Sequence, residues 1–153
     1  MPEDEIRSLI TDEHRALVGV QGEPATVTVR EADAHRLRDL CGDDDPRYAD
    51  GTGIAPPYVI SSLGNASRRE SPNILPGGLM TQQEWKFTRP FRIGEELTAI
   101  SQISDIRERL GGRYGYSILI TTTTNYYDAE HNHVAAVMMT LTQFDPAGAG
   151  ETE

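Results

Sequence analysis

The sequence predicts a single α+β domain in which a curved antiparallel sheet wraps around one short buried helix. The second half of the chain contains four long stretches with the alternation of strands, and turn residues separate each stretch from the next. The first half instead holds short amphipathic segments and one apolar segment that follows a pair of prolines. At 153 residues, the chain is long enough for one domain with one hydrophobic core.

Three elements are expected near the start of the chain. Residues 5–18 have a loose helical spacing of apolar residues, and residues 31–41 form a short amphipathic helix that a glycine ends. Between them, residues 25–30 alternate and are β-branched, which predicts a strand. Cys41 closes the second helix, and no histidine lies near it in this motif. We therefore expect Cys41 to be a small buried residue and not a nucleophile.

The middle of the chain predicts the buried helix. Proline is tolerated in the first turn of a helix, so the apolar run after Pro56 and Pro57 indicates a short helix over residues 57–67. A loop follows. The four strand stretches cover residues 79–89, 96–109, 114–127 and 133–144. The domain is expected to span residues 1–145, with a polar, disordered tail at 146–153.

The composition of the chain argues against some classes of binding partner. The net charge of −10 argues against nucleic acid, whose phosphates require a basic surface. No apolar run approaches the roughly 20 residues of a membrane helix, and the acidic N-terminus lacks the apolar stretch of a signal peptide. A single cysteine fits a reducing compartment. We expect a cytoplasmic protein with neither a nucleic-acid nor a membrane partner.

The histidines give no metal site. His14 and His35 fall on the polar parts of predicted helices, where surface positions are expected. His131 and His133 flank a predicted hairpin turn and could begin a metal site, but no cysteine or acidic cluster in the sequence completes one. They are expected to be solvated turn residues.

An acidic motif separates the two halves of the N-terminal region. Gly42-Asp43-Asp44-Asp45-Pro46-Arg47-Tyr48 follows the second helix, and Ile54-Ala55-Pro56-Pro57 opens the central one. Asp, Gly and Pro favour turns, so the ordinary interpretation of the motif is a solvated turn.

With two further blocks, this motif resembles the MaoC-like branch of the hot-dog fold, and in particular its FAS1-like dehydratase N-terminal type. The blocks are Gly77-Gly78-Leu79-Met80 and the stretch Gln83-Glu84-Trp85-Lys86-Phe87-Thr88-Arg89-Pro90, with Gly94 following. The resemblance covers roughly residues 5 to 145 and implies a hot-dog fold. It also implies the family's chemistry, in which water adds across the double bond of a trans-2-enoyl thioester or is removed from an (R)-3-hydroxyacyl thioester.

Active members carry the motif Gly-Asp-x-Asn-Pro-x-His, whose Asp and His hold the reacting water between two titrating groups. Amides at the start of the central helix, usually in a His-Gly pair, stabilise the thioester oxyanion. This chain keeps Asp43 but has Asp45 for the asparagine and Tyr48 for the histidine. A phenol, which titrates near pH ~10, is a poorer proton shuttle than imidazole. Pro56 and Pro57 stand where the amide donors would be, and proline has no N–H.

These departures predict a non-catalytic subunit that shapes the acyl pocket of a heteromeric hydratase or dehydratase. Its partner would be a catalytic MaoC-like hot-dog chain, in a heterodimer or heterotetramer. No cofactor is implied, since coenzyme A or an acyl-carrier protein serves only as the thioester carrier. The resemblance implies acyl-pocket or substrate-contacting roles for Pro57, Tyr58, Ile60, Leu63, Ile74, Leu75, Gly77, Gly78 and Met80. Plain core packing is the alternative for each of them.

Two other functions stay open. The chain could be a self-sufficient homodimeric hydratase or a thioesterase that uses Asp43, Asp45 or Tyr48. It could also be an acyl-thioester binding module without turnover. Under the preferred hypothesis, the short central helix would leave room for a bulky acyl group such as a steroid or polyketide.

Overall fold

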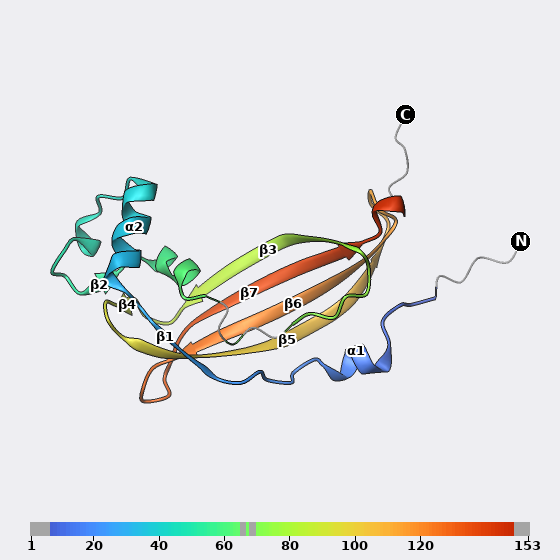
Figure 1. Cartoon of the computed structure of the whole chain (residues 1–153), viewed down its shortest axis with the longest axis horizontal. Helices are drawn as coiled ribbons and strands as arrows, with labels where there is room; N and C mark the ends of the chain where they lie inside the picture. Colours follow the sequence, from blue (N-terminus) through green and yellow to red (C-terminus); the bar gives the residue numbers. More distant parts are fainter. Residues whose placement is uncertain (1–6, 65–66, 68–69, 149–153) are drawn as a thin grey trace, which may run out of the picture.

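The computed structural model describes residues 7–64, 67 and 70–148, and they form one long twisted sheet (Figure 1). The helix at residues 31–41 lies at one end of this sheet, and the helix at residues 12–16 lies toward the other. The elements in chain order are α1 (Asp12–Ala16), β1 (Ala25–Thr28), α2 (Glu31–Cys41), η1 (Pro46–Tyr48), β2 (Ile54–Ala55), η2 (Pro57–Ser62), β3 (Gly77–Phe87), β4 (Phe91–Arg92), β5 (Glu96–Leu110), β6 (Tyr116–Tyr127), β7 (His133–Phe144) and η3 (Pro146–Gly148). The symbol η marks a 3₁₀-helix. The predicted α+β class is confirmed.

The main sheet has five antiparallel strands in the order β1-β5-β6-β7-β3. Consecutive long strands pair as hairpins, while β3 crosses over to pair with β7 at the far edge. The turn residues between the strands therefore do what their composition predicts. The second edge of β3 has no partner strand among the described residues.

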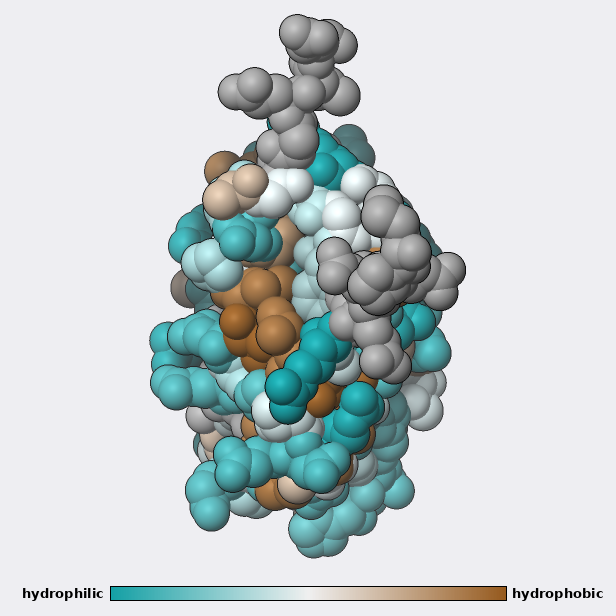
Figure 2. Space-filling model, turned by 90° about the vertical axis from the view of Figure 1, so that its right-hand side faces the viewer, coloured by the Kyte–Doolittle hydropathy of each residue, from teal (hydrophilic) through white to brown (hydrophobic). Residues whose placement is uncertain are grey.

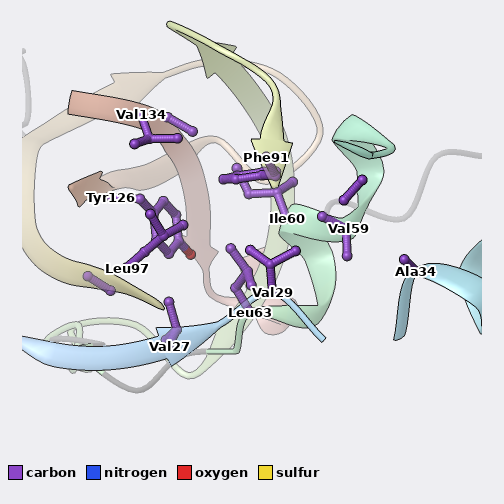
Figure 3. Packing of buried hydrophobic residues seen from close by; sticks show 13 residues of the cluster. Val27, Val29, Ala34, Val59, Ile60, Leu63, Phe91, Leu97, Tyr126 and Val134 are labelled. Carbon is purple, nitrogen blue, oxygen red and sulfur yellow. The ribbon is translucent and has the colours of Figure 1, made fainter. Parts of the chain in front are cut away.

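Two hydrophobic clusters share one face of this sheet, which we call the inner face. The first cluster joins η2 and α2 to the sheet, and Figure 3 shows its labelled residues converging from η2, β1, β5, β6 and β7. The second lies toward the other end of the strands and includes Ile103, Ile118 and Ile120. Residues of β6 at positions of the same parity enter both clusters, as the period of two in a strand requires.

The central helix differs from the prediction. Residues 57–67 were expected to form a helix, but the structure has a 3₁₀-helix at Pro57–Ser62 only, and residues 65 and 66 lie outside the described part of the chain. The hydroxyls of Ser61 and Ser62 donate to the carbonyls of Tyr58 and Val59 at 2.8 and 2.7 Å, competing with helical backbone bonds. Gly64, at φ 76°, then turns the chain away.

The first helix is also shorter than predicted. Within the expected range 5–18, only Asp12–Ala16 is helical. The Thr11 hydroxyl accepts from the His14 amide at 3.2 Å while His14 Nδ1 accepts from the Thr11 amide at 3.1 Å, so a capping box begins the helix late. After it, Val18 forms an isolated bridge with Ile103 of β5. After this helix the chain therefore runs along the edge of the sheet and does not continue as a helix.

Helix α2 matches its predicted range, but its last turn is exposed. Cys41, expected to be buried, is exposed, and so is Leu40 beside it. The buried face of α2 is carried by Ala34 and Leu37. Because α2 projects beyond the end of the sheet, its final turn has no core to cover (Figure 1).

The histidine positions are as expected with one exception. His131 lies exposed in the β6–β7 turn, with φ 64°. His133, however, is half-buried at the start of β7, where its ring nitrogens bond Thr88 at 3.0 Å and Asn125 at 2.9 Å. It is therefore a bonded strand residue, and the expectation of a solvated turn position is wrong for it. No group of three or more metal-ligating side chains gathers within the described ranges.

The first residues of the C-terminal segment form a short 3₁₀-helix. The expected tail at 146–153 starts with the turn η3, in which the Gly148 amide donates to the Asp145 carbonyl at 3.0 Å, and residues 149–153 are not described. Among the helices of the described chain, none has the length and hydrophobicity needed to cross a bilayer.

Candidate functional site

The acidic motif begins where α2 ends. Gly42 takes the left-handed conformation, with φ 60° and ψ 32°, so that its own amide and that of Asp43 bond back to the last turn of the helix. This C-cap directs the Asp43 side chain back over the turn. One carboxylate oxygen of Asp43 accepts the Asp45 amide at 3.0 Å. The turn is thus built locally from its own residues.

The second oxygen of Asp43 is also occupied. It accepts the hydroxyl of Tyr58, on η2, at 2.7 Å. The Tyr58 hydrogen bond, followed by that of the Asp45 amide, lowers the pKa of Asp43, while burial and the Asp43 carboxylate raise the pKa of Tyr58. Asp43 is therefore a carboxylate with both oxygens bonded, and Tyr58 a neutral phenol that donates to it. The lowered pKa favours the ionised form of Asp43, and the raised pKa favours the neutral form of Tyr58.

Asp45 is used in the same way. One of its oxygens accepts the Arg47 amide at 3.0 Å, and the guanidinium of Arg47 approaches its carboxylate at 2.7 Å. These contacts lower the pKa of Asp45 and start the 3₁₀ turn of η1. Arg47 also lies over the Tyr48 ring, 5.3 Å from its centroid. The residue at the position of the family's asparagine thus holds the turn.

Tyr48 lies between two clefts. One, of about 280 Å³, is lined by Tyr48, Ala55, Pro57 and the β3–β4 connection with Phe87 and Phe91. The sequence-predicted positions Tyr48 and Pro57 are therefore brought together, while Asp43 and Asp45 do not line this cleft. Three of the eight residues that line this cleft are aromatic, and Arg89 is the one charged residue among them.

The second cleft, of about 170 Å³, lies against α2. Tyr48 shares it with His35 and Asp50, whose Nε2 and Oδ1 atoms are 3.1 Å apart. The side chains of His35 and Asp50 are 46% and 73% exposed. The sequence did not indicate this pair, because residues on α2 and on the loop after η1 meet only in the folded chain.

The largest hollow among these is a cavity of about 420 Å³ on the inner face of the sheet. We call it the inner cavity. Its lining residues come from η2, β3, β6 and β7, namely Ile60, Ser61, Gly64, Met80, Gln83, Trp85, Thr122, Thr124, Tyr126, Val137 and Met139. Its volume falls within the ~300–1,000 Å³ typical of small-molecule sites. Of the residues expected to contact an acyl group, Ile60 and Met80 line it.

The other predicted pocket residues lie elsewhere. Leu63 belongs to the first cluster, and Ile74 and Leu75 pack against the second. The amides of Ile74 and Leu75 also donate to the buried Gln143 side chain at 2.9 and 3.1 Å. Gly77 and Gly78 begin β3, where a Cβ on Gly77 would come within 2.8 Å of the Phe144 ring. The glycine there permits close strand packing.

The order of residues along β6 indicates the inner cavity, although the overall composition does not. On β6, Ile118 and Ile120 are followed at the same parity by Thr122, Thr124 and Tyr126. A change from isoleucine to threonine on a core-facing set of positions indicates a place where the core is not filled by apolar side chains. Trp85, Val137 and Met139 had no comparable signal, because they lie on other strands.

The open edge of β3 completes the site. Leu79, Met80, Trp85 and Phe87 are 54%, 58%, 37% and 39% exposed along this strand. In Figure 2, which views the molecule from the end where β3 begins, hydrophobic surface in brown lies between hydrophilic residues in teal. An unpaired edge strand that exposes apolar side chains is a template for pairing with another chain.

Comparison with known proteins shows the family to which the chain belongs. A family model described as the FAS1-like dehydratase domain region matches residues 16–137, which is most of the sequence. The chain belongs to the FAS1-like dehydratase family. This membership agrees with the resemblance carried by the acidic motif and the β3 block. No curated protein matches the sequence.

Solved structures with the same hot-dog architecture share little sequence with this FAS1-like dehydratase domain. The ChsH1-ChsH2 complex from Mycobacterium tuberculosis is 20% identical, with a TM-score of 0.69, covering 89% of this chain and 94% of that chain. The HadBC (3R-hydroxyacyl-ACP dehydratase) complex from the same organism is 16% identical, with a TM-score of 0.67 and coverage of 82% and 96%. The R-hydratase PhaJ1 from Pseudomonas aeruginosa is 16% identical, with a TM-score of 0.56 and coverage of 84% and 82%. The predicted hot-dog fold is confirmed.

Proposed function

We propose that this chain is the non-catalytic, pocket-forming subunit of a heteromeric trans-2-enoyl-thioester hydratase or 3-hydroxyacyl-thioester dehydratase. The partner is a second hot-dog chain that carries the catalytic Asp and His. In the hydration direction, the oxygen of water bonds to C3 of the enoyl thioester and the water loses one proton, while C2 gains one. The partner's side chains handle both proton transfers. This chain supplies part of the space that holds the acyl group.

One observation carries the proposal. At the family's catalytic position, the Asp43 carboxylate is bonded by the Tyr58 hydroxyl at 2.7 Å and the Asp45 amide at 3.0 Å. A general base must be within hydrogen-bond reach of a water that it can deprotonate. Each oxygen of Asp43 already accepts one bond, which holds η2 against the acidic turn, and the lowered pKa makes this carboxylate a weaker base. A tyrosine stands where the second titrating group would be, and Pro57 lacks the amide hydrogen for an oxyanion.

The open edge of β3 supports a partner chain. Four exposed apolar side chains lie along a strand that pairs on one side with β7 and, among the described residues, on the other side with nothing. Pairing with a second hot-dog sheet would satisfy the backbone and bury this surface. Two of the similar structures are described as complexes, HadBC and ChsH1-ChsH2.

The inner cavity supports the pocket-forming role. Met80, Gln83 and Trp85 connect it to the same β3 edge on which the partner would dock. An acyl chain that enters from the partner's active site would therefore reach the cavity across the interface. The shortness of η2, which ends at Ser62, leaves this space unfilled.

A second candidate function is a self-sufficient enzyme. His35, 3.1 Å from Asp50 in a cleft shared with Tyr48, is the observation that favours it, because this pair could hold a water. The high exposure of this pair argues the other way, since bulk water screens its interaction and no closed pocket excludes solvent from a substrate there. The carbonyl of Tyr48 accepts from Arg38 at 2.7 Å, which ties this loop to α2 by a structural bond.

The proposal is tested by turnover of trans-2-octenoyl-CoA, followed by loss of the enoyl absorbance. Three samples are compared, namely this chain alone, the hot-dog protein encoded beside it alone, and the two co-expressed and purified as a complex. We expect turnover by the complex, and little by this chain alone.

Two controls separate the candidates. Substitution of the catalytic His of the partner should abolish activity of the complex, while His35→Ala in this chain should leave it. Turnover by this chain alone, lost on His35→Ala, would establish the second candidate and overturn the first.

A further inference from the structure

The hydroxyls of β6 have different hydrogen bonds on the two faces of the sheet. On the outer face, the hydroxyl of Thr121 bonds that of Thr140 at 2.9 Å, and the Thr123 hydroxyl donates to Ser104 at 2.9 Å. On the inner face, Thr124 bonds the buried Ser101 at 2.6 Å. The outer hydroxyls are thus paired with one another, which leaves the inner positions Thr122 and Tyr126 to be explained.

Tyr126 is the most unusual of these residues. Its side chain is only 2% exposed and belongs to the first hydrophobic cluster, yet it also lines the inner cavity. Burial raises its pKa, so the phenol is neutral and remains a hydrogen-bond donor. Its hydroxyl makes no hydrogen bond to another described residue, and it is not one of the fully buried side-chain atoms that lack a partner. A hydroxyl that is not fully enclosed at the cavity wall can donate to a ligand there.

The strand register places Tyr126 beside a mixed surface. Thr124 lies opposite Val137 and Thr122 opposite Met139, and these two residues in turn face Trp85 and Gln83 of β3. The inner cavity therefore has hydroxyls on β6 and apolar side chains on β7 and η2, with an indole and an amide at the β3 edge. A purely apolar chain would offer no partner to the hydroxyls of Thr122 and Tyr126, whereas that of Thr124 is already bonded to Ser101.

We propose that the inner cavity binds the acyl group of a thioester whose apolar skeleton carries a ketone or hydroxyl oxygen, and that this oxygen accepts a hydrogen bond from the Tyr126 hydroxyl. The proposal rests on the pocket-forming role above and specifies the substrate class. Thr122, at the same parity on β6, is a further polar contact for such an oxygen. Tyr126 is in this account a specificity-determining residue, and it takes no part in the chemical step.

The chain carries its own reporter for a binding test. Trp85 is the single tryptophan and lines the inner cavity, so its fluorescence responds to occupancy. Titrations use the purified chain with decanoyl-CoA and with three matched probes, the 5-, 7- and 9-oxodecanoyl-CoA thioesters. We expect at least one oxo probe to bind about threefold to tenfold more tightly than decanoyl-CoA, as one added hydrogen bond in a buried site provides.

Two variants test the residue. Tyr126→Phe deletes only the hydroxyl, and the ratio of the two dissociation constants should fall to about one. Tyr127→Phe is the matched control, because it deletes the hydroxyl of the next residue, which does not line the cavity. The ratio of the unmodified chain should persist in Tyr127→Phe.

Results that contradict this inference can be told apart from results that contradict the proposed function. Equal binding of all four probes by the unmodified chain would overturn the inference and leave the pocket-forming role intact. A preference for an oxo probe that survives Tyr126→Phe would also overturn it. Absence of binding by every probe would show that the cavity holds no acyl group, whereas the turnover experiment decides separately whether the chain is the non-catalytic subunit.

Discussion

The acidic turn and the inner cavity are two polar regions on the same scaffold, and their hydrogen bonds differ. In the turn, Asp43 and Asp45 spend their oxygens on Tyr58, Arg47 and backbone amides. In the cavity, Tyr126 lines the space and its hydroxyl makes no hydrogen bond to another described residue. The carboxylates of the first region are bonded within the chain, although Arg38 Nε on the adjoining helix is buried without a partner. The second region presents a hydroxyl that a ligand can reach.

This difference indicates what the chain has kept. A site for acid–base chemistry needs groups free to bind and exchange a proton, whereas the Asp43 carboxylate links the turn after α2 to η2. A site for binding needs space and donors, and the inner cavity has both. The predictions below test this division, beginning with the largest effect.

The core that supports both regions should be the most sensitive to truncation. Phe91 is fully buried in the first cluster and also lines the cleft beside Tyr48. Phe91→Ala should lower the free energy of unfolding by about 3–5 kcal/mol, measured by urea denaturation. Phe87, whose ring lies 5.7 Å away edge-on, is 39% exposed and is the matched control. Phe87→Ala should cost no more than about 1 kcal/mol. Equal losses would contradict the proposed core.

Gly77 and Gly78 distinguish packing from substrate contact on β3. A Cβ on Gly77 would lie 2.8 Å from a Phe144 ring carbon and 2.9 Å from its carbonyl oxygen, whereas one on Gly78 would approach a Leu141 methyl at 3.4 Å. Gly77→Ala should therefore reduce stability by about 1–3 kcal/mol. Gly78→Ala, the control, should change it by about 0.5 kcal/mol or less. A stable Gly77→Ala variant with weakened thioester binding would favour substrate contact instead.

The bond that closes the acidic turn should be visible in the titration of Asp43. Tyr58→Phe removes the donor that contributes most to the lowered pKa of Asp43. That pKa should rise toward its ordinary value while the Asp45 amide keeps part of the effect. The measurement is carboxyl-carbon NMR against pH, with Tyr127→Phe as the control. An unchanged Asp43 titration would mean that the phenol does not hold the carboxylate in solution.

The smallest expected effect is the dependence of stability on acid. Four carboxyl groups have lowered pKa values because hydrogen bonds stabilise their charged forms, namely Asp43, Asp45, Glu108 and Asp128. The folded state then binds fewer protons than the unfolded chain, so their contribution is present above about pH 4 and is lost as the pH falls below it.

Urea unfolding at about pH 6, 4 and 3 checks this sign. Asp128 closes the β6–β7 turn by accepting the Glu130 and Asn132 amides at 2.9 Å each. Asp128→Asn should therefore reduce the loss of unfolding free energy between about pH 6 and 3. Stability that rises between about pH 4 and 3 would contradict the assignment.

Periodicity was enough to predict the sheet and α2, because these elements follow from residue spacing along one segment. The strand at 133–144 and the helix at 31–41 have the bounds that their patterns predict. The central helix was misjudged because two serine hydroxyls, at Ser61 and Ser62, compete with its backbone bonds. Hydroxyl–carbonyl competition of this kind depends on rotamers that a hydrophobic pattern does not contain.

The site was predictable only in part. The degenerate motif at Asp43 and Tyr48 is visible in the sequence, but the bond from Tyr58 to Asp43 joins residues 15 apart and depends on how η2 packs on α2. Likewise, His35 and Asp50 meet only after folding. The threonines of β6 were part of a recognised alternation, yet their cavity also needs β3 and β7. Spacing predicts which face a residue occupies, and not what lies opposite it.

The most direct test of the non-catalytic role is the turnover number of the co-expressed complex in which this chain carries Asp43→Asn. The amide keeps an oxygen that can accept from Tyr58, and recovery of the complex by size-exclusion chromatography controls for assembly. We predict a kcat within about twofold of the unmodified complex. A loss of about 100-fold or more, the size expected when a general acid or base is removed, would make Asp43 catalytic and contradict the account.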